Sequence, residues 1–371
     1  MLPRPTVPGL QSADSGESDD WQWLPDESEP LQSAWYSGAR WVRLLTPLSF
    51  VYSLIVRIRR QYIENDLEGR FKPPVPTVIV GNINVGGTGK SPLVVWLASW
   101  LVAKGHRPGI VSRGYGGRSH EYPLDVHEWT DPAMCGDEPV MIARRTGCPV
   151  VVDPNRVRAV RELLAEHNCD VVISDDGLQH YHLDRDVEIA VVDGDRGLGN
   201  GLCLPAGPLR EPVSRLKEVD FVVINGEGEP ALPCEAYHML PVETRFMHVE
   251  TREPIGLDEL PGKRVHAVAG IGNPDRFFQS LRDLGYDVIE HRFEDHHIYR
   301  ISDLMFGDTL PVIMTEKDAV KCRLLDPGLV HPDFWYLEIN VSIPSTFETA
   351  LLSRLGLNVT PLKVVAGNEN L

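Results

Sequence analysis

The stretch Gly86-Gly87-Thr88-Gly89-Lys90-Ser91 decides the fold, because it follows the apolar run Val78-Ile79-Val80 and precedes an apolar segment at 92–103. A strand, a glycine-rich loop and a helix in this order form a cradle for the phosphates of a nucleoside triphosphate. The glycines allow backbone N–H groups to turn toward the phosphate oxygens. Lys90 adds a positive charge near the β- and γ-phosphates, and the Ser91 hydroxyl is placed to bind Mg²⁺. The predicted helix directs its positive end at the same place.

One position of this loop departs from the strict pattern, which has a glycine five residues before Gly89 where this chain has Asn84. Gly81 and Gly86 lie on either side of it. A glycine-rich turn without a ligand is the alternative interpretation. That alternative does not explain a Lys-Ser pair at the expected offset between an apolar strand and an apolar helix, so we expect phosphate binding.

The composition indicates a globular protein that is long enough for two domains. The chain has 371 residues, of which 42% are hydrophobic and 24% charged. Its formal net charge of -17 opposes binding to a nucleic-acid backbone, so we expect no nucleic-acid partner. The six cysteines contain no C-x-x-C pair, which favours reduced thiols in a cytosolic protein over a disulfide framework or a zinc site. No signal peptide is expected, because residues 1–30 contain no apolar core.

The N-terminal part changes composition abruptly. Residues 1–30 are rich in Pro, Ser and acidic residues and predict a disordered acidic tail. Residues 31–70 mix aromatic and aliphatic side chains with arginines, and their uncharged run over 44–56 is shorter than the about 20 residues that span a bilayer. Arginines and aromatic residues suit an amphipathic helix that lies in the membrane interface. The alternative is an ordinary helix packed on the domain, and composition does not separate the two.

From residue 77 onward, β-branched apolar runs alternate with helical segments. Expected strands lie at 77–80, 109–112, 150–153, 171–174, 189–193 and 221–224, with helices at 92–103, 139–145 and 156–167. This alternation predicts a P-loop NTPase-like α/β fold, with a mostly parallel sheet and helices on both faces.

A second series of elements follows a segment that is rich in Pro and Glu. Its expected strands lie at 265–269, 287–290, 312–315 and 336–341, with helices at 274–284 and 319–325. We therefore expect a P-loop domain at 71–230, a linker at 231–262 and a smaller α/β C-terminal domain at 263–371.

The run Val171-Val172-Ile173-Ser174-Asp175-Asp176 supplies the second half of the predicted nucleotide site. Ligands of open parallel sheets lie at the carboxyl ends of the strands, where Asp175 and Asp176 are expected. A carboxylate at such a strand end holds the Mg²⁺ that bridges the β- and γ-phosphates. Asp-Asp-Gly also suits a helix cap or a turn. After an upstream glycine-rich loop, the metal interpretation is favoured for at least one of the two.

Two further clusters carry groups that are suited to proton transfer. Cys135-Gly136-Asp137-Glu138-Pro139 places two carboxylates just before a predicted helix, and Phe293-Glu294-Asp295-His296-His297 places two histidines beside acids. Phosphoryl transfer to an alcohol needs a group that takes the proton of the acceptor hydroxyl, and an Asp supported by a His can do so. Each cluster alone also suits a helix cap or a charged surface, and Asp-His-His also occurs in metal sites.

The segment 193–215 is rich in Gly and Pro and follows a predicted strand, which is typical of a functional loop. Within it, Arg210 is a candidate for stabilising charge on the transferred phosphoryl group, and Glu211 for assisting Mg²⁺ binding. A surface Arg–Glu pair is the alternative.

Taken together, these motifs resemble the tetraacyldisaccharide 4'-kinase family, the lipid A 4'-kinases. The resemblance runs from about Trp41 almost to the C-terminus, and it rests on the ordered series of motifs rather than on the generic phosphate loop. Asn84 resembles the family's own departure from that loop. The matching segments are 81–92, 112–116, 136–139, 175–180, 199–201, 204–211, 270–274, 295–297 and 315–318.

The resemblance implies an ATP- and Mg²⁺-dependent kinase that phosphorylates the 4'-hydroxyl of a tetraacyl glucosamine disaccharide 1-phosphate during lipid A synthesis. It implies peripheral or monotopic attachment to the cytoplasmic face of the bacterial inner membrane, because a multiply acylated substrate lies in the bilayer. The acidic tail before Gln32 extends beyond the family's usual start, and its charge would oppose binding to anionic lipid.

The resemblance also implies roles for individual residues. The implied roles are a proton-accepting dyad of Asp137 with His296, nucleotide and metal binding by Lys90 and Ser91, acids around Mg²⁺ at Asp175, Asp176 and Glu211, and charge stabilisation by Arg210. Which of the two aspartates touches the metal stays open. So does the choice between His296 and His297 as partner of Asp137, although the first matches the motif better.

Two functions of other classes remain open from the residues alone. A P-loop switch or metallochaperone NTPase would use the same phosphate loop but needs neither an interfacial helix nor a pairing of Asp137 with His296. A metal-dependent phosphoesterase centred on Asp295-His296-His297 would work without a nucleotide. The residues make no prediction of oligomeric state or acyl-chain preference.

Overall fold

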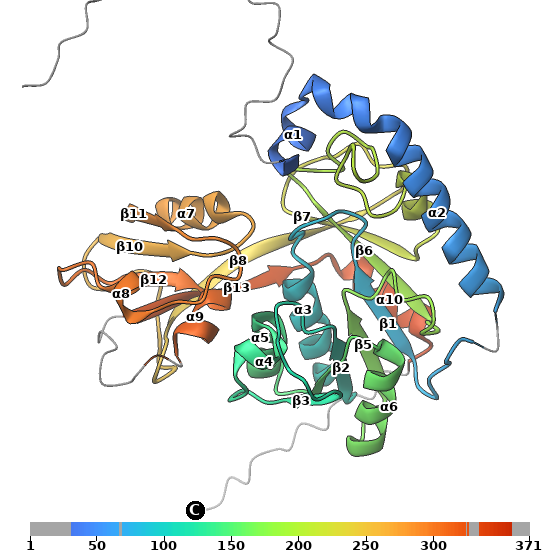
Figure 1. Cartoon of the computed structure of the whole chain (residues 1–371). Coiled ribbons are helices and arrows are strands. Elements are labelled where there is room, and N and C mark those ends of the chain that lie inside the picture. Colours follow the sequence, from blue (N-terminus) through green and yellow to red (C-terminus); the bar gives the residue numbers. More distant parts are fainter. Residues whose placement is uncertain (1–30, 67–68, 324, 326–333, 358–371) are drawn as a thin grey trace, which may run out of the picture.

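The computed structural model describes residues 31–66, 69–323, 325 and 334–357, so the predicted acidic tail at 1–30 lies outside the described residues. Within the described ranges, the strands form one 13-stranded sheet in the order β11-β10-β12-β13-β8-β7-β6-β1-β5-β2-β4-β3, and β9 pairs with β8. Figure 1 shows the two parts of this sheet, with β8 and β13 running between them. The predicted α/β architecture with a mostly parallel sheet is confirmed.

The first part of the sheet is parallel except at its edge. Its strands are β1 (Thr77–Gly81), β2 (Pro108–Ser112), β4 (Val150–Val152), β5 (Val171–Asp175), β6 (Val187–Asp193) and β7 (Phe221–Asn225), with β3 (Leu124–Val126) antiparallel at the edge. In β1, Val78 and Val80 enter one hydrophobic core and Ile79 enters the other, because successive side chains of a strand alternate between faces. Both faces are therefore buried, as the apolar strands predict.

Helices cover both faces of this part. The first core receives α3 (Lys90–Ala103), α5 (Asp137–Thr146) and α10 (Ser345–Leu355), and the second receives α6 (Arg156–Glu166). Short elements complete the connections: α4 (Pro132–Cys135) and the 3₁₀ helix η2 (Val213–Lys217). The last of the core helices, α10, returns from the end of the chain, where Glu348 accepts a hydrogen bond of 2.9 Å from Trp100 Nε1.

Strand β8 (Tyr237–His248) joins the two parts of the sheet. It pairs in parallel with β7 at its start and antiparallel with β13 (Phe334–Ser342) along most of its length. The expected linker at 231–262 therefore contains a strand that belongs to both parts. Sequence analysis missed this strand because residues such as Pro241 and Glu243 interrupt its apolar alternation.

The second part of the sheet repeats the layering of the first on a smaller scale. Its elements are β9 (Pro254–Ile255), β10 (Arg264–Ala269), β11 (Asp287–Arg292) and β12 (Val312–Thr315), with α7 (Pro274–Asp283), α8 (Ile301–Leu304) and α9 (Glu316–Cys322). Phe278 of α7 lies in one core, and Ala319 of α9 lies in the other. Thr315 ends β12 and caps α9, because its side chain accepts a hydrogen bond from the N–H of Asp318. This cap fixes the direction in which α9 enters the site described below.

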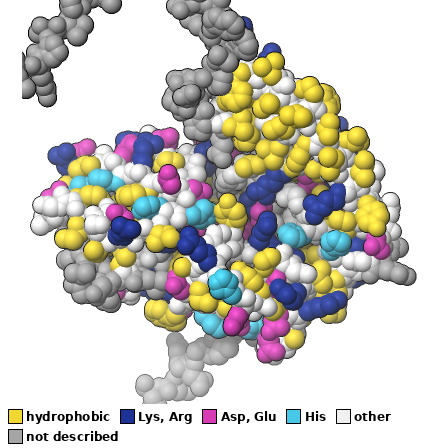
Figure 2. Space-filling view, in the orientation of Figure 1, with side chains coloured by type: hydrophobic (Ala, Val, Ile, Leu, Met, Phe, Trp, Pro, Cys, Tyr) yellow, Lys and Arg dark blue, Asp and Glu magenta, His cyan; other side chains and the backbone are white. Residues whose placement is uncertain are grey.

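Helix α2 (Thr46–Asn65) follows α1 (Leu31–Ser37) and the 3₁₀ helix η1 (Arg40–Leu45) and has two different faces. On one face, Ser49 Oγ donates to Cys203 O at 2.7 Å and accepts from the N–H of Ala206 at 3.0 Å. The opposite face presents hydrophobic side chains, which Figure 2 shows gathered above a border of Lys and Arg. Side chains that are more than half exposed here are Leu44, Leu48, Phe50, Val51, Leu54, Ile55, Ile58 and Tyr62.

The length of this apolar segment corrects one expectation. The helical segment Arg40–Asn65 is long and apolar enough to cross a membrane by length and composition, with a hydropathy of 1.4. The expectation that the segment is too short was wrong, because the helix continues beyond the uncharged run through Arg57 and Arg59. The bonds of Ser49 nevertheless hold one face of α2 on the protein, which favours a helix that lies along a membrane surface.

Candidate active site

The loop after β1 has the backbone that phosphate binding requires. Gly86 and Gly89 have φ angles of +96° and +86°, in the left-handed region that glycine adopts without strain. A Cβ at Gly89 would lie 2.1 Å from Asn225 Nδ2, so this position accepts no side chain. Asn82 Nδ2 donates to Gly86 O at 3.2 Å and to Thr88 Oγ1 at 3.0 Å, which holds the loop from inside.

The same loop offers free donors to an anion. Helix α3 begins at Lys90 directly after the loop, and none of the described side chains caps its first turn. A Cβ placed at Gly87 would meet no atom within 4 Å, so there is space beside the loop. Unpaired N–H groups and the positive end of a 14-residue helix attract phosphate. The triphosphate of a nucleotide therefore fits this cradle.

Asn84, which departs from the generic loop pattern, has a structural purpose here. Its side chain is buried, and Nδ2 donates to Gly197 O at 3.0 Å. Its backbone forms a bridge with Leu209. Both contacts join the phosphate loop to the glycine-rich loop 193–215. A glycine at this position would lose the side-chain bond.

Asp175 is the last residue of β5, and Asp176 follows it in the turn beside the phosphate loop. Asp175 is buried and its Oδ2 accepts a hydrogen bond from Ser112 Oγ at 3.1 Å, while its Oδ1 has no hydrogen-bond partner among the described residues. The Asp176 carboxylate lies 3.5 Å from Lys90 Nζ and 3.2 Å from Arg210 Nη1. A buried carboxylate oxygen without a donor fits a site for a hard cation such as Mg²⁺.

The two aspartates differ in acidity. Burial raises the pKa of Asp175 to about 7, and the charges of Glu138 and Asp176 add to this effect. Burial also opposes ionisation of Asp176, but Lys90 and Arg210 outweigh it and lower the pKa of Asp176. A bound divalent cation would restore the charge of Asp175, because a nearby positive charge favours the carboxylate.

Glu211 is buried and is held by the side chains of three neighbouring residues. Its Oε1 accepts from Gln179 Nε2 at 2.7 Å, and its Oε2 accepts from Tyr181 Oη at 2.5 Å. Arg215 Nε lies 3.3 Å from the same carboxylate. Gln179 in turn contacts Arg210 Nη1 at 3.4 Å. Glu211 therefore joins the site through Gln179 and Arg210, and its direct binding of Mg²⁺ stays a prediction.

The structure brings Asp137 and His296 together from the two parts of the sheet. Asp137 opens α5 and His296 lies in the turn after β11, and His296 Nδ1 is 3.1 Å from Asp137 Oδ2. His297 points elsewhere, with its Nε2 3.2 Å from Asp303 Oδ2. The residue that contacts Asp137 is therefore His296. The exposed ring of Tyr115 lies over its imidazole, with 5.2 Å between centroids.

The environment of this pair favours an ionised carboxylate. Burial would raise the pKa of Asp137, but the hydrogen bond with His296 and the charges of Lys317 and Lys321 lower it overall. The pKa of His296 is raised, first by its bond to Asp137, against the effects of burial and of Lys317. The pair thus couples a charged acceptor to an imidazole that binds protons readily.

The arrangement around residues 295–297 does not resemble a metal centre. Asp295 Oδ1 lies 3.6 Å from Lys317 Nζ and 3.8 Å from His296 Nε2, while His297 faces Asp303. In the part of the chain that the structure describes, no three His, Cys, Asp or Glu side chains form a group that could hold a metal ion. His296 and His297 contact different carboxylates, an arrangement that the metal-dependent phosphoesterase alternative does not predict.

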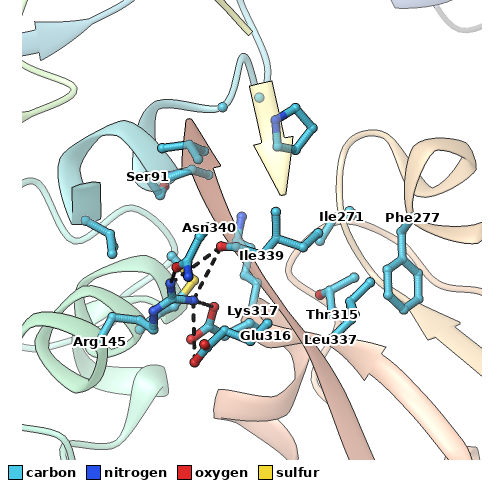
Figure 3. Close-up of a pocket in the computed structure, with 18 of the residues that line it drawn as sticks. Ser91, Arg145, Ile271, Phe277, Thr315, Glu316, Lys317, Leu337, Ile339 and Asn340 are labelled. Carbon is cyan, nitrogen blue, oxygen red and sulfur yellow. Dashed lines mark hydrogen bonds and ion pairs between the residues drawn. The ribbon is translucent and has the colours of Figure 1, made fainter. Parts of the chain in front are cut away.

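A cleft of about 800 Å³ lies between the two parts of the sheet. The phosphate loop lines one wall, and Ile271, Phe277 and Lys317 line the other. Figure 3 shows Arg145 reaching across one side toward Glu316, and Arg145 Nη1 lies 2.8 Å from Glu316 Oε2. This ion pair links α5 to α9 directly beside the cleft. The cleft is large enough for a nucleotide.

Sequence analysis assigned no role to three charged residues of the site. Lys317 and Lys321 approach Asp137 from α9, and their spacing of four residues was a usable sign that they share one helix face. Arg156 is buried behind Asp175 and donates to its backbone carbonyl at 3.2 Å. Nothing in the local sequence distinguishes Arg156 from an ordinary surface arginine at a helix start.

The chain is similar to several proteins that are named tetraacyldisaccharide 4'-kinase. Residues 41–356 match the family model described as Tetraacyldisaccharide-1-P 4'-kinase. The chain is 55% identical over 314 residues to the tetraacyldisaccharide 4'-kinase of Alkalilimnicola ehrlichii, an alignment that covers 84% of this chain and 92% of that protein. The enzyme of the same name from Nitrosococcus oceani is 48% identical, with 90% of this chain and 96% of that protein covered.

A solved structure shares the fold over nearly its whole length. The crystal structure of "apo" form LpxK from Aquifex aeolicus in complex with ATP has a TM-score of 0.72 and 28% sequence identity, covering 85% of this chain and 99% of that chain. The family match spans the phosphate loop, the paired aspartates, the Asp137–His296 contact and the helix that carries Lys317. The chain therefore belongs to the tetraacyldisaccharide-1-P 4'-kinase family.

Proposed function

We propose that this chain transfers the γ-phosphoryl group of ATP to the 4'-hydroxyl of a tetraacyldisaccharide 1-phosphate in lipid A biosynthesis. The family's name gives the acceptor and the 4'-position, and the similar solved structure was determined with ATP. The observation that carries the proposal is the 3.1 Å contact between Asp137 and His296, beside the cleft that the phosphate loop opens. An alcohol acceptor needs a proton acceptor at this place. A P-loop switch needs none, which disfavours that alternative.

The nucleotide end of the site is built from the loop and the strand ends around it. The N–H groups of 86–89 and the ammonium of Lys90 bind the phosphates, and Arg210 stabilises charge on the transferred group. Ser91, Asp175 and Asp176 would hold Mg²⁺, with Glu211 supporting them through Gln179. Mg²⁺ neutralises charge on the β- and γ-phosphates when it is bound.

The acceptor end of the site is the Asp137–His296 pair. The 4'-oxygen forms a bond to the γ-phosphorus, and the bond from that phosphorus to the β–γ bridging oxygen breaks. The hydroxyl proton passes to the pair, in which the imidazole shares a proton with Asp137 Oδ2. Because these residues come from opposite parts of the sheet, we further propose that 71–230 and 263–371 act as two domains around the cleft. Residues 231–262 cross between them, and α10 of the second segment packs back on the core of the first.

The lipid substrate requires access to a membrane. The apolar face of α2 is exposed along the helix, and Lys and Arg side chains border it (Figure 2). We propose that this face rests in the cytoplasmic leaflet of the inner membrane as a peripheral or monotopic anchor. Its apolar side chains would contact the lipid acyl chains, and the bordering arginines would contact the headgroups. The Ser49 contacts keep the anchor attached to loop 193–215, which carries Arg210.

The direct test measures transfer of ³²P from γ-labelled ATP to purified tetraacyldisaccharide 1-phosphate in detergent micelles. ATP hydrolysis is followed in the same samples, and wild type is compared with Asp137→Ala and Lys90→Ala. Labelled lipid from wild type alone supports the proposal. ATP hydrolysis without labelled lipid in wild type would overturn it in favour of a P-loop switch.

A further inference from the structure

Lys317 is the side chain that connects the two parts of the site by charge. Its Nζ lies 3.2 Å from Glu138 Oε1 and 4.0 Å from Asp137 Oδ1, both on α5 of the first part. It also lies 3.6 Å from Asp295 Oδ1, in the turn that carries His296. The lysine side chain is only 17% exposed, so water screens these contacts less than it screens a surface ion pair.

A second lysine completes the charged surroundings of Asp137. Lys321 Nζ lies 3.8 Å from Asp137 Oδ2 and 2.8 Å from Asp318 Oδ1, over the ring of Tyr299. Because residues four apart lie on one face of a helix, the Thr315 cap directs both lysines of α9 toward α5. Lys321 is committed to the buried Asp318, whereas Lys317 is shared among three carboxylates at the interface.

Lys317 also lies close to the phosphate cradle. It lines the same cleft as the loop 87–91. Its partner Asp295 is near Gly272, since a Cβ on Gly272 would lie 3.6 Å from Asp295 Oδ2 and 3.9 Å from Gly87 N. Lys317 therefore lines the cleft together with the phosphate loop, and its partner Asp295 lies on the side of Gly272 that faces this loop.

We propose that Lys317 is a positioning residue for the phosphoryl transfer, whose charge keeps Asp137 and His296 unprotonated and held together across the two parts of the site. This inference rests on the proposed function. A pair that must take a proton works only while it is free of one. A fixed positive charge within ion-pair distance makes that state persist to lower pH.

The charges around the pair agree with this role. Asp137 faces His296, Lys317 and Lys321, and His296 faces Asp137, Asp295 and the ring of Tyr115. Lys317 lowers the pKa of both members of the pair. The pKa of Lys317 itself is raised, because Glu138, Asp137 and Asp295 together outweigh its burial. Lys317 thus stays charged over the pH range in which the imidazole titrates.

The test is the pH dependence of phosphoryl transfer in the full-length chain, measured for wild type, Lys317→Met and Lys317→Arg. Lys263→Met is the matched control, because it removes the same charge from the second part of the sheet at a lysine that lies over the ring of Tyr286. In wild type, the rate of phosphoryl transfer should fall at low pH, and this fall is called the acid limb. We expect Lys317→Met to move the acid limb to higher pH, so that its rate relative to wild type is about tenfold lower at about pH 6 than at about pH 9. Lys317→Arg restores the limb, since it keeps the charge. A pH-independent loss, or a limb that stays in place, would overturn the inference.

A second measurement does not depend on activity. The titration of His296 is followed by NMR on ¹³C-histidine-labelled protein, assigned with His296→Asn. In Lys317→Met the imidazole should keep its proton to higher pH than in wild type, and an unchanged titration would contradict the inference. The two proposals can fail separately. If wild type produces no labelled lipid, the proposed function is wrong. If wild type is active but Lys317→Met has the same pH dependence as wild type, only the role of Lys317 is wrong.

Discussion

Asp137 Oδ2 and His296 Nδ1 meet at 3.1 Å although 159 residues separate them in the chain. Asp137 stands at the start of a helix, and His296 has a φ angle of +63° that few residues other than glycine adopt. Residues held in such sparsely populated backbone conformations cluster at active sites. The contact therefore depends on both the start of α5 and the turn that carries His296.

The first prediction concerns the joint action of this pair. Asp137→Ala and His296→Ala should each lower the rate of phosphoryl transfer by about 10²–10⁴-fold, the range of general acid–base catalysis. Because both residues serve one proton transfer, the double variant should be little slower than the slower single variant. Single-turnover transfer to micellar substrate measures all three rates. Additive losses would show that the two residues act independently.

His297→Ala is the matched control for these variants. His297 is adjacent to His296 in the chain but contacts Asp303 instead. It should retain transfer activity close to that of wild type. A loss as large as that of His296→Ala would contradict the assignment of the pair.

The second prediction is the pH dependence of the wild-type reaction. The bond to Asp137 raises the pKa of His296 above its ordinary value, although burial and Lys317 oppose this. Since the pair accepts a proton only when it is free of one, activity should fall as pH decreases through that raised pKa. In profiles of kcat against pH, the midpoint of the acid limb should lie above about 6.5, the ordinary pKa of histidine.

Asp137→Asn tests the cause of that limb. It removes the charge that raises the pKa of His296, so NMR should show the imidazole losing its proton at lower pH than in wild type. This direction is opposite to the one expected for Lys317→Met. A titration of His296 that is the same in wild type and Asp137→Asn would disprove the assigned cause.

Local patterns in the sequence predicted the elements but not their partners. The apolar run before Gly86 is β1, and the aspartates 175–176 lie at a strand end as expected, since these signals depend only on neighbouring residues. Strand β8 escaped prediction, because its pairing with β7 and β13 decides its conformation more than its own mixed composition does.

In the site as well, features that neighbouring residues determine could be predicted from the sequence, whereas contacts between distant segments could not. The resemblance to the family favoured His296 over His297, and the structure agrees. The residues alone left the choice open, because the backbone turn after β11 decides which of two adjacent histidines faces Asp137. The bonds of Glu211 to Gln179 and Tyr181 join segments that are 30 and more residues apart in the chain. Lys317 lacked a role in the sequence because its three carboxylate partners come from two distant segments.

The third prediction concerns the phosphate loop. Gly89→Ala should lower the free energy of unfolding by about 1–3 kcal/mol from its strained φ of +86° alone, and a clash with Asn225 Nδ2 adds to this. Urea denaturation measures the loss. Adding Asn225→Ala should recover the part that comes from the clash. Gly87→Ala, where a Cβ meets nothing within 4 Å, is the control and should unfold nearly as wild type does.

The fourth prediction concerns the apolar face of α2, where Leu54 is 58% exposed. Leu54→Glu places a charge where we propose that acyl chains lie, so binding to vesicles should weaken by about tenfold or more. Solvent already surrounds this side chain, so the free energy of unfolding should change little. Flotation with vesicles of inner-membrane composition measures binding, and urea denaturation measures stability.

Met305→Glu is the control for this experiment, because Met305 is 65% exposed but lies on the second part of the sheet beyond α8. It introduces the same charge at an exposed apolar position and should leave vesicle binding unchanged. If both variants bound vesicles as well as wild type does, the apolar face of α2 would not be the membrane contact.

If both variants lost binding equally, the effect would come from the net charge of the chain, which is already -17 and opposes binding to anionic lipid. Loss confined to Leu54→Glu assigns the contact to α2, whose Ser49 anchors it to the loop that carries Arg210.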